Sequence, residues 1–295
     1  MHTPVLLKEV LEMLDPKPGQ TVVDCTLGAA GHGSEIAKAL SPRGIFVGID
    51  WDWQRLEAAK ENLEKEELDL KKLVLIEGNY AETVEILKDE SLAKVDGLLV
   101  DLGFSSDQLG EGRGFSFKGK EEPLEMTYSK GAIPAYQLLA QLGERKITTL
   151  LKDLSDERYA ERIAKAIVEH RRKGAILTNK DLAETVRKAV PRNYEKGRID
   201  PATRTFMALR MYANREMENL EDLLKSLEYI VQSGGRVVII SYHSKEDALL
   251  KSFFKKMAYE GKAKLLNKKV IKPSREEMLS NPRSRSAKLR AIEIL

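Results

Sequence analysis

The 295-residue chain is poor in cysteine and in long apolar runs, and each shortage excludes a class of protein. Cys25 is the only cysteine, so the sequence cannot form an internal disulfide framework. No apolar stretch approaches the roughly 18 residues of a membrane-spanning helix. The N-terminal residues lack the basic region, apolar core and cleavage site of a signal peptide. We therefore expect a globular cytoplasmic protein that does not enter a membrane.

The net charge of the whole chain is small, but its basic residues are concentrated in two segments. The net charge is +3, but Arg158 to Arg210 contains 14 basic against 6 acidic residues, and Gly261 to Arg290 contains 10 against 2. Each segment therefore carries +8, which leaves −13 for the remainder. Segregated basic charge is typical of proteins that bind a polyanion, most commonly nucleic acid, although basic residues can also be scattered over solvated helix faces.

A glycine-rich loop follows the first apolar run, Thr21 to Cys25, and is the first candidate ligand site. Its glycines are Gly28, Gly31 and Gly33, and Ser34 is a plausible N-cap of the helix that follows. Glycine allows backbone N–H groups to approach a ligand closely, and a helix N-terminus favours polar or anionic ligand atoms. The loop therefore predicts a cofactor cradle, although many strand-to-helix turns contain glycine for structural reasons alone.

The second apolar run, Gly44 to Ile49, ends in Asp50, which narrows the choice of cofactor. An acid at this strand end is placed to accept hydrogen bonds from two ribose hydroxyls, so the cofactor is expected to carry adenosine. The loop lacks the G-x-G-x-x-G pattern of dinucleotide sites and the G-K-[ST] of nucleoside-triphosphate sites. S-adenosylmethionine fits better because it has no phosphate to bind.

Strand and helix patterns alternate through the first hundred residues. Lys72 to Glu77 and Val95 to Val100 predict the third and fourth strands, with a helix near residues 81–88 between them and Asp101 at the end of the fourth. The next convincing strand is Arg236 to Ile240, far beyond the length of an ordinary crossover. Helical periodicity at residues 136–139, 160–167 and 182–190 predicts a helical insert in this interval.

The C-terminal third completes the predicted α/β sheet. We expect a helix over residues 214–231 that leads through Ser233, Gly234 and Gly235 into the fifth strand, because the glycine pair suits a helix C-terminus in the left-handed region. Lys264 to Ile271 and Leu289 to Leu295 are candidates for two final strands.

Several sequence blocks in order give the chain a family resemblance. It resembles the small-subunit ribosomal RNA cytosine-N4 methyltransferases, the MraW or RsmH type, over nearly its whole length. The matching blocks are residues 2–7, 26–32, 101–103, 105–106, 108–109, 113–117, 201–206, 241–244, 246–247, 281–283 and 285–286.

The resemblance implies a class I, Rossmann-like, S-adenosylmethionine-dependent methyltransferase sheet with an inserted helical domain. The methyltransferase domain would comprise residues 1–112 and 214–295, and residues 113–213 would form a mainly helical substrate-recognition domain. The implied substrate is the N4 amine of a cytidine in the decoding centre (P site) of 16S rRNA in the small ribosomal subunit. The implied cofactor contacts are Ala30, Gly31, His32, Asp50, Tyr80, Asp101 and Gln108.

The order of residues after the fourth strand suits chemistry at an exocyclic amine. Such an amine is a poor nucleophile, so an enzyme must accept its hydrogen and align its nitrogen with the sulfonium methyl group. Asp101 and Phe104 have the spacing of the D-P-P-Y type motif of amino-directed DNA methyltransferases and are the catalytic candidates. Asp101 or a nearby carbonyl would accept the hydrogen and Phe104 could stack on the base, or Phe104 could be a core residue.

Other chemistries have weaker support. Methylation at ring carbon 5 requires a cysteine nucleophile, and Cys25 lies at the first strand, away from Asp101. The histidines form no metal pattern, and His243 is either a structural residue or part of the substrate mouth. An NAD-dependent oxidoreductase and an inactive RNA-binding protein of this fold remain alternatives. The candidate phosphate contacts, all basic, are Arg171, Arg172, Lys173, Lys268, Lys269, Arg283 and Arg285.

Overall fold

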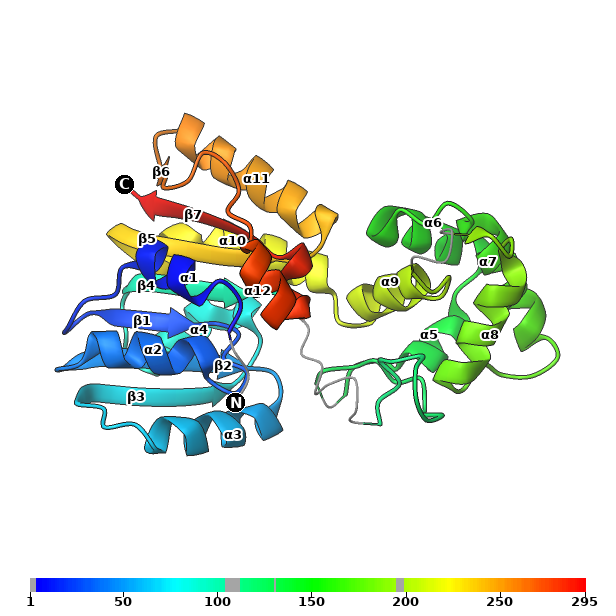
Figure 1. Cartoon of the computed structure of the whole chain (residues 1–295), viewed down its shortest axis with the longest axis horizontal. Coiled ribbons are helices and arrows are strands. Elements are labelled where there is room, and N and C mark those ends of the chain that lie inside the picture. Colours follow the sequence, from blue (N-terminus) through cyan, green and yellow to red (C-terminus); the bar gives the residue numbers. More distant parts are fainter. Residues whose placement is uncertain (1–3, 104–111, 130, 195–198) are drawn as a thin grey trace. The chain divides into compact units, whose positions relative to one another are not determined.

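The chain divides into two compact units in the computed structural model, which describes residues 4–103, 112–129, 131–194 and 199–295 (Figure 1). Unit 1 comprises Met1–Gly103 and Met217–Leu295, and unit 2 comprises Phe104–Glu216. The sequence predicted domain boundaries after residues 112 and 213. The first lies nine residues after the boundary at Gly103, and the second lies three residues before the boundary at Glu216.

Unit 1 is built on a seven-stranded sheet in the described part of the chain, with strand order β3-β2-β1-β4-β5-β7-β6. Strand β7 runs antiparallel to both of its neighbours, β5 and β6, and the remaining strand pairs are parallel. Parallel strands need crossover connections, and helices between the strands supply them. The strands are β1 (Thr21–Asp24), β2 (Gly44–Asp50), β3 (Leu70–Glu77), β4 (Val95–Asp101), β5 (Val231–Ser241), β6 (Ala263–Leu265) and β7 (Lys288–Ile294).

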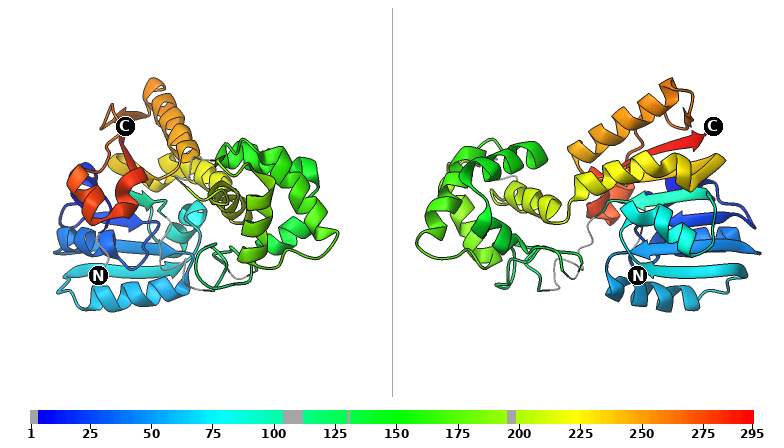
Figure 2. Two further views of the ribbon diagram at one scale, coloured as in Figure 1. Left: turned by 45° about the vertical axis from the view of Figure 1, so that its right-hand side comes forward. Right: turned by 180° about the vertical axis from the view of Figure 1, so that it is seen from behind.

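Helices cover both faces of this sheet. One face packs against α1, α2 and α3, and the other against α4, α10 and α11 (Figures 1 and 2). Two short helical segments, α12 and η4, precede β7, and η1 precedes α4. The helices of unit 1 are α1 (Leu7–Leu14), α2 (Gly31–Leu40), α3 (Trp53–Glu64), η1 (Tyr80–Glu82), α4 (Thr83–Asp89), α10 (Glu216–Ile230), α11 (Ser244–Tyr259), α12 (Arg275–Ser280) and η4 (Pro282–Ser286).

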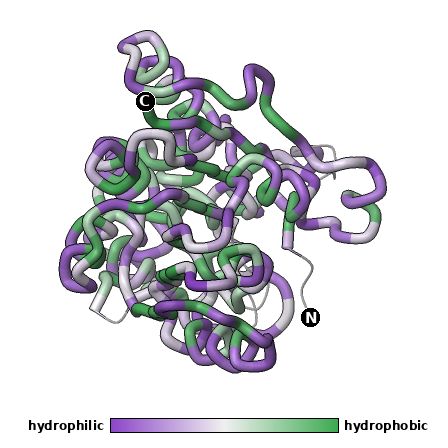
Figure 3. The backbone as a smooth tube through the Cα atoms, turned by 90° about the vertical axis from the view of Figure 1, so that its left-hand side faces the viewer, coloured by the Kyte–Doolittle hydropathy of each residue, from purple (hydrophilic) through white to green (hydrophobic). Residues whose placement is uncertain are grey.

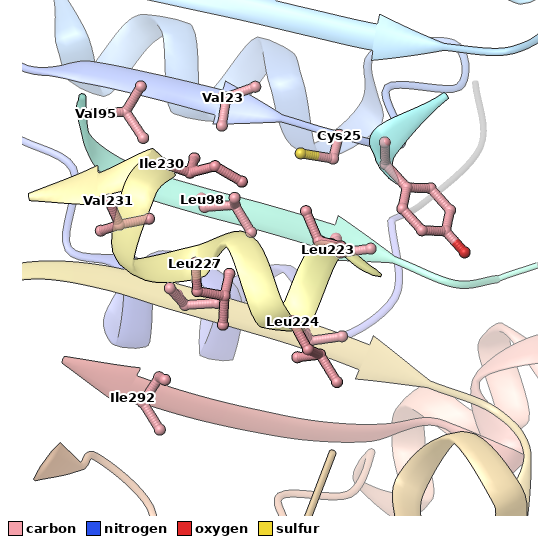
Figure 4. Packing of buried hydrophobic residues seen from close by; sticks show 14 of the residues in the cluster. Val23, Cys25, Val95, Leu98, Leu223, Leu224, Leu227, Ile230, Val231 and Ile292 are labelled. Atoms are coloured by element: carbon pink, nitrogen blue, oxygen red, sulfur yellow. The ribbon is translucent and has the colours of Figure 1, made fainter. Parts of the chain in front are cut away.

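The two cores of unit 1 follow from the two-residue period of its strands. Leu98 and Val100 of β4 pack on the face of α4, α10 and α11, whereas Leu99 packs on the opposite face. Figure 4 shows Leu223, Leu224 and other residues of α10 packed against the strands. Buried on both faces, the central strands read as nearly continuous hydrophobic runs. Figure 3 shows hydrophobic (green) and hydrophilic (purple) stretches alternating along the backbone.

Unit 2 is mainly helical and has a hydrophobic core of its own. Its helices are α5 (Ala135–Gln141), α6 (Glu144–Ser155), α7 (Ala160–Arg171), α8 (Asn179–Ala189) and α9 (Thr203–Ala213). Helix α8 begins with a capping box, in which Thr178 and Asp181 bond to each other's backbone N–H groups. The predicted helical insert is confirmed, while α6 and α9 were not predicted.

Three local predictions require correction. Helix α2 begins at Gly31 and has Ala30 as its N-cap, so Ser34 is a residue of the helix and not its cap. Helix α10 ends at Ile230, and Gly234, with φ 80°, lies beyond it within β5. The run Lys264 to Ile271 contributes only its first residues to β6, followed by an isolated bridge between Ile271 and Leu289. The fold class predicted from the sequence, an α/β Rossmann-like sheet with a helical insert, is confirmed.

Candidate functional site

Three aspartates end three adjacent parallel strands. Asp24 ends β1, Asp50 ends β2 and Asp101 ends β4, and β1 lies between the other two strands. The carboxyl ends of parallel strands meet at one edge of a sheet, which is where open α/β sheets bind ligands. The predicted placement of Asp50 and Asp101 at strand ends is confirmed, and Asp24 forms a third carboxyl group between them.

The glycine loop turns sharply from β1 into α2. Gly28 has φ 55° and Ala30 has φ 61°, both in the left-handed region, and the N–H of Ala30 donates to the carbonyl of Leu27 at 2.9 Å. Glycine adopts this conformation without strain, whereas alanine does so at a cost. The Ala30 side chain is buried among the residues under α2, so it contributes to packing there.

Asp50 connects the glycine loop to the end of β2. Its Oδ2 accepts a hydrogen bond from the N–H of Gly28 at 2.8 Å, and its Oδ1 accepts one from the N–H of Asp52 at 3.0 Å. Burial raises the pKa of Asp50, and these two N–H donors and the Arg55 guanidinium oppose that rise. A carboxylate has about four lone-pair positions, so each oxygen retains capacity for a ligand hydroxyl.

Tyr80 lies three residues beyond the end of β3, at the same edge of the sheet. Its ring meets the ring of Trp51 edge to face, with centroids 5.6 Å apart, and Trp51 is the residue after Asp50. Tyr80 is buried, and its carbonyl accepts a hydrogen bond from the Thr83 hydroxyl at 2.6 Å. The role of Tyr80 as a cofactor contact stays a prediction.

Gly31 and His32 contact the N-terminal segment of the chain. A Cβ at Gly31 would lie 2.9 Å from Cγ of Pro4, so the absence of a side chain admits the proline ring. The Nε2 of His32 lies 2.8 Å from the carbonyl of Val5, and since a carbonyl only accepts, Nε2 carries the proton. The structure therefore gives both residues a structural function, and their contact with a cofactor stays a prediction.

The Asp101 carboxylate has several polar partners within unit 1. Its Oδ1 accepts from the N–H of Gly103 at 3.0 Å, and Nδ1 of His32 lies 3.9 Å from its Oδ2. The hydroxyl of Tyr242 donates a further hydrogen bond to the carboxylate. Burial raises the pKa of Asp101, while His32, the Gly103 N–H and Tyr242 lower it. Burial is the largest of these effects, so the pKa of Asp101 lies above its ordinary value although the three partners oppose the rise.

Sequence reasoning missed Asp24 and Tyr242 as site residues. Asp24 is almost fully buried, and its Oδ1 accepts from the N–H of Thr26 at 3.1 Å. Burial, with the nearby charges of Asp101 and Asp50, raises the pKa of Asp24 to about 7. The position of Asp24 at the end of a predicted strand was the available signal. Tyr242 directly follows the fifth strand, which was the corresponding signal for that residue.

Two predicted residues, Phe104 and Gln108, lie outside the described residues. Cys25 is fully buried, with its Sγ 3.6 Å from the hydroxyl of Thr83, and burial raises the pKa of its thiol to about 12. A thiol with this pKa is not a thiolate near neutral pH, which agrees with the expectation that Cys25 is a buried small residue. Figure 4 shows it inside the hydrophobic cluster.

The basic candidates differ in their surroundings. Nη1 of Arg171 donates to the carbonyls of Leu139 and Leu142 at 2.8 and 2.6 Å, so this guanidinium caps the end of α5. That engagement weakens the prediction that Arg171 contacts a phosphate. The other candidates are exposed: Arg172, Lys173, Lys268, Lys269, Arg283 and Arg285.

His243 is a structural residue at the start of α11. Its Nδ1 accepts a hydrogen bond from the N–H of Lys245 at 3.2 Å, and with Glu246 it forms a capping box. Within the residues that the structure describes, no group of three or more histidine, cysteine or acidic side chains could hold a metal ion. The described helices include none with the length and apolar character needed to cross a membrane.

Comparison with known proteins gives consistent matches over the full chain. A family model described as the MraW methylase family matches residues 1–295. Ribosomal RNA small subunit methyltransferase H of Dictyoglomus thermophilum is 42% identical over 295 residues, covering 99% of this chain and 96% of the relative. The proteins of the same name from Coprothermobacter proteolyticus and Thermotoga neapolitana are 42% and 40% identical, covering 99% and 100% of this chain and 95% and 96% of the relatives.

Proposed function

The chain belongs to the MraW methylase family, and from this premise we propose that it transfers a methyl group from S-adenosylmethionine to ribosomal RNA of the small subunit. The proposed target is the N4 amine of a decoding-centre (P-site) cytidine in 16S rRNA. Relatives about 40% identical over the whole chain are named small-subunit ribosomal RNA methyltransferases, which supports the RNA class. The acids at the ends of β2 and β4, beside the glycine loop, carry the argument for the chemistry.

The acidic edge of the sheet fits S-adenosylmethionine. Asp50 retains lone pairs for the two ribose hydroxyls, and Trp51, which is partly exposed and packs against the buried ring of Tyr80, offers aromatic surface next to it. Asp101, and Asp24 above its raised pKa of about 7, bring negative charge to the same edge, which suits a ligand with a sulfonium and an ammonium group. When bound, the cofactor supplies an electrophilic methyl group.

Asp101 is the residue that we assign to the substrate amine. The nitrogen lone pair of cytosine N4 is delocalised into the ring, so the amine reacts only when a hydrogen-bond acceptor aligns it. The structure offers Asp101 as a largely buried carboxylate fixed by the Gly103 N–H. A base held in line with the methyl group would then present its N4–H to this carboxylate.

The alternative functions require different features of the protein. The family match does not support the NAD-dependent oxidoreductase considered from the sequence. Methylation at ring carbon 5 would require a reactive thiolate, and Cys25 is buried with a raised pKa. An inactive RNA-binding protein of this family would bind S-adenosylmethionine without turnover.

One experiment separates these possibilities. The protein is incubated with methyl-labelled S-adenosylmethionine and small ribosomal subunits that lack the modification, and the RNA is digested to nucleosides. We expect label in N4-methylcytidine at a single decoding-centre position, and we expect Cys25→Ser to give the same product. Label in 5-methylcytidine would contradict the assignment to N4. Cofactor binding without any transfer would favour the inactive RNA-binding protein.

A further inference from the structure

Tyr242 lies beside Asp101 although 140 positions separate them in the sequence. It directly follows β5, the neighbour of β4 in the sheet, so the ends of the two strands bring the residues together. A Cβ at Gly103 would lie 2.9 Å from Oδ1 of Asp101 and also 2.9 Å and 3.0 Å from Cε2 and Cζ of the Tyr242 ring, so the two side chains meet beside Gly103. There the hydroxyl of Tyr242 donates to the Asp101 carboxylate. Glycine at position 103 therefore admits the phenol ring against the segment that follows β4.

Hydrogen bonds from the backbone also fix the position of Tyr242. One carboxylate oxygen of Glu246, Oε2, accepts hydrogen bonds from the N–H groups of Tyr242 and His243, both at 3.0 Å. Glu246 is buried, at 4% exposure, in the first turn of α11. A tyrosine has two side-chain torsions, so a fixed backbone and a packed ring determine where its hydroxyl points.

We propose that Tyr242 is a positioning residue for methyl transfer, whose hydroxyl holds the Asp101 carboxylate in the orientation that accepts hydrogen from the cytidine amine. The inference rests on the proposed function, because it needs an amine substrate at Asp101. It assigns to Tyr242 a role that a residue packed only for stability would not have. The residue acts through Asp101 and touches neither the methyl group nor the nitrogen.

The proposed step balances in protons and electrons. The N4 lone pair forms the new bond to the methyl carbon, and the carbon–sulfur bond breaks with its electron pair moving to sulfur. The nitrogen, now positively charged, releases one proton to the Asp101 carboxylate. Burial and the negative Asp101 raise the pKa of Tyr242, so the phenol keeps its own proton and remains a donor. Asp101 can therefore receive the substrate proton without losing its anchor.

Charged groups from four elements surround this pair. Asp24 at the end of β1 and His32 on α2 interact with Asp101, and Glu246 on α11 and Glu277 on α12 raise the pKa of the phenol. Tyr242 lowers the pKa of Asp101, whereas burial raises it. Removal of the hydroxyl therefore raises the pKa of Asp101, and the fraction of ionised carboxylate at a given acidic pH falls.

The test compares Tyr242→Phe with wild type and with Tyr229→Phe, a control at an exposed tyrosine of α10. We expect Tyr242→Phe to lower kcat about tenfold to a hundredfold, the scale of one hydrogen bond to a charged group, with an unchanged KM for S-adenosylmethionine. The acidic limb of its pH–rate profile should move to higher pH. The control should match wild type.

A second readout does not depend on turnover. The Asp101 carboxyl is titrated by carbon-13 NMR in the protein without ligand, with its signal assigned by Asp101→Asn, and Tyr242→Phe should raise its pKa. Unchanged kcat, pH profile and titration in a folded Tyr242→Phe protein would overturn the inference while leaving the proposed function intact. A wild-type protein that forms no N4-methylcytidine would overturn both.

Discussion

At the scale of single residues, the site depends on carboxylates whose surroundings set their charge. Asp24, Asp50 and Asp101 share one edge of the sheet, and burial raises the pKa of each. Backbone N–H groups offset this differently: Asp50 receives two such bonds, while Asp24 and Asp101 each receive one. The number of backbone N–H donors that each carboxylate has in the folded protein therefore influences which of the three acids stays ionised.

We expect Asp50→Asn to weaken binding of S-adenosylmethionine by about 1.5 to 3 kcal/mol, because a charged acceptor for ribose hydroxyls is lost. The substitution keeps the shape of the side chain but also weakens the bond that Asp50 accepts from the Gly28 N–H. Isothermal titration calorimetry measures the change. Asp222→Asn, at an exposed residue of α10, is the matched control. Equal affinity in the two variants would remove Asp50 from the cofactor site.

Asp24 should make stability fall as pH rises. The pKa of Asp24 is about 7 in the folded protein and about 3.9 in an unfolded chain, so the folded state binds this proton more tightly. Its contribution is fully present below pH 4, is lost as pH rises to about 7 and stays constant above that. The total change is about 4 kcal/mol.

Asp24→Asn removes this titration and provides the measurement. Denaturant unfolding of both proteins at pH 5 and pH 8 should show a smaller loss of stability with pH in the variant. The two pH values lie on either side of the folded pKa, which separates the proton effect from any constant effect of the amide. Parallel changes in both proteins would show that Asp24 does not bind a proton in this range.

At the scale of elements, the ends of helices and strands hold the functional groups. Helix α2 begins at Gly31 because Ala30 adopts the left-handed conformation, which brings His32 into the first turn beside Asp101. Gly33 faces inward, where a Cβ would lie 2.7 Å from Cδ1 of Leu27. The glycine loop therefore serves the packing of its helix as well as the approach of a ligand.

Arg171 should stabilise unit 2 through the end of α5. We expect Arg171→Ala to lower the free energy of unfolding by about 1 to 2 kcal/mol, because the carbonyls of Leu139 and Leu142 lose a charged donor that is itself partly exposed. Arg172→Ala, at the neighbouring exposed arginine, should change it by less than about 0.5 kcal/mol. The loss of the helical circular dichroism signal with increasing denaturant measures both free energies of unfolding. Equal stabilities would show that the cap contributes nothing measurable.

At the scale of the whole molecule, basic charge is carried by both units. Exposed Arg172 and Lys173 belong to unit 2, whereas Lys268, Lys269, Arg283 and Arg285 belong to unit 1. Outside residues 261–290, unit 1 contains more acidic than basic residues, as the uneven charge of the sequence requires. A polyanionic substrate would therefore be attracted to two separate segments of the chain.

The salt dependence of substrate binding tests these segments. We expect Arg172→Ala with Lys173→Ala to weaken binding of small ribosomal subunits, and to flatten the plot of log affinity against log salt by up to about one unit per lost phosphate contact. Cofactor affinity should not change. The pair Lys60→Ala and Lys225→Ala, at exposed lysines outside both basic segments, is the control. A slope equal to the control's would identify Arg172 and Lys173 as solvated helix surface.

The sequence by itself determined the features that depend on short stretches of chain. The periods of apolar residues located all or part of β1 to β5, and each acid at a strand end followed from its neighbours, so Asp50 and Asp101 could be named. The long interval between Asp101 and the next predicted strand indicated the helical insert. These patterns suffice because a strand buried on both faces needs a nearly continuous apolar run.

Tertiary structure alone decided the features that join distant segments. The hydrogen bond from Tyr242 to Asp101, the contact of Pro4 with Gly31 and the cap that Arg171 makes on α5 each cross many residues of sequence. Ser34 was wrongly predicted as a cap because helix α2 starts from a left-handed residue, which no side-chain pattern reveals. The raised pKa of Asp24 likewise requires the burial that only the assembled sheet provides, because the cost of desolvating a charge depends on everything packed around it.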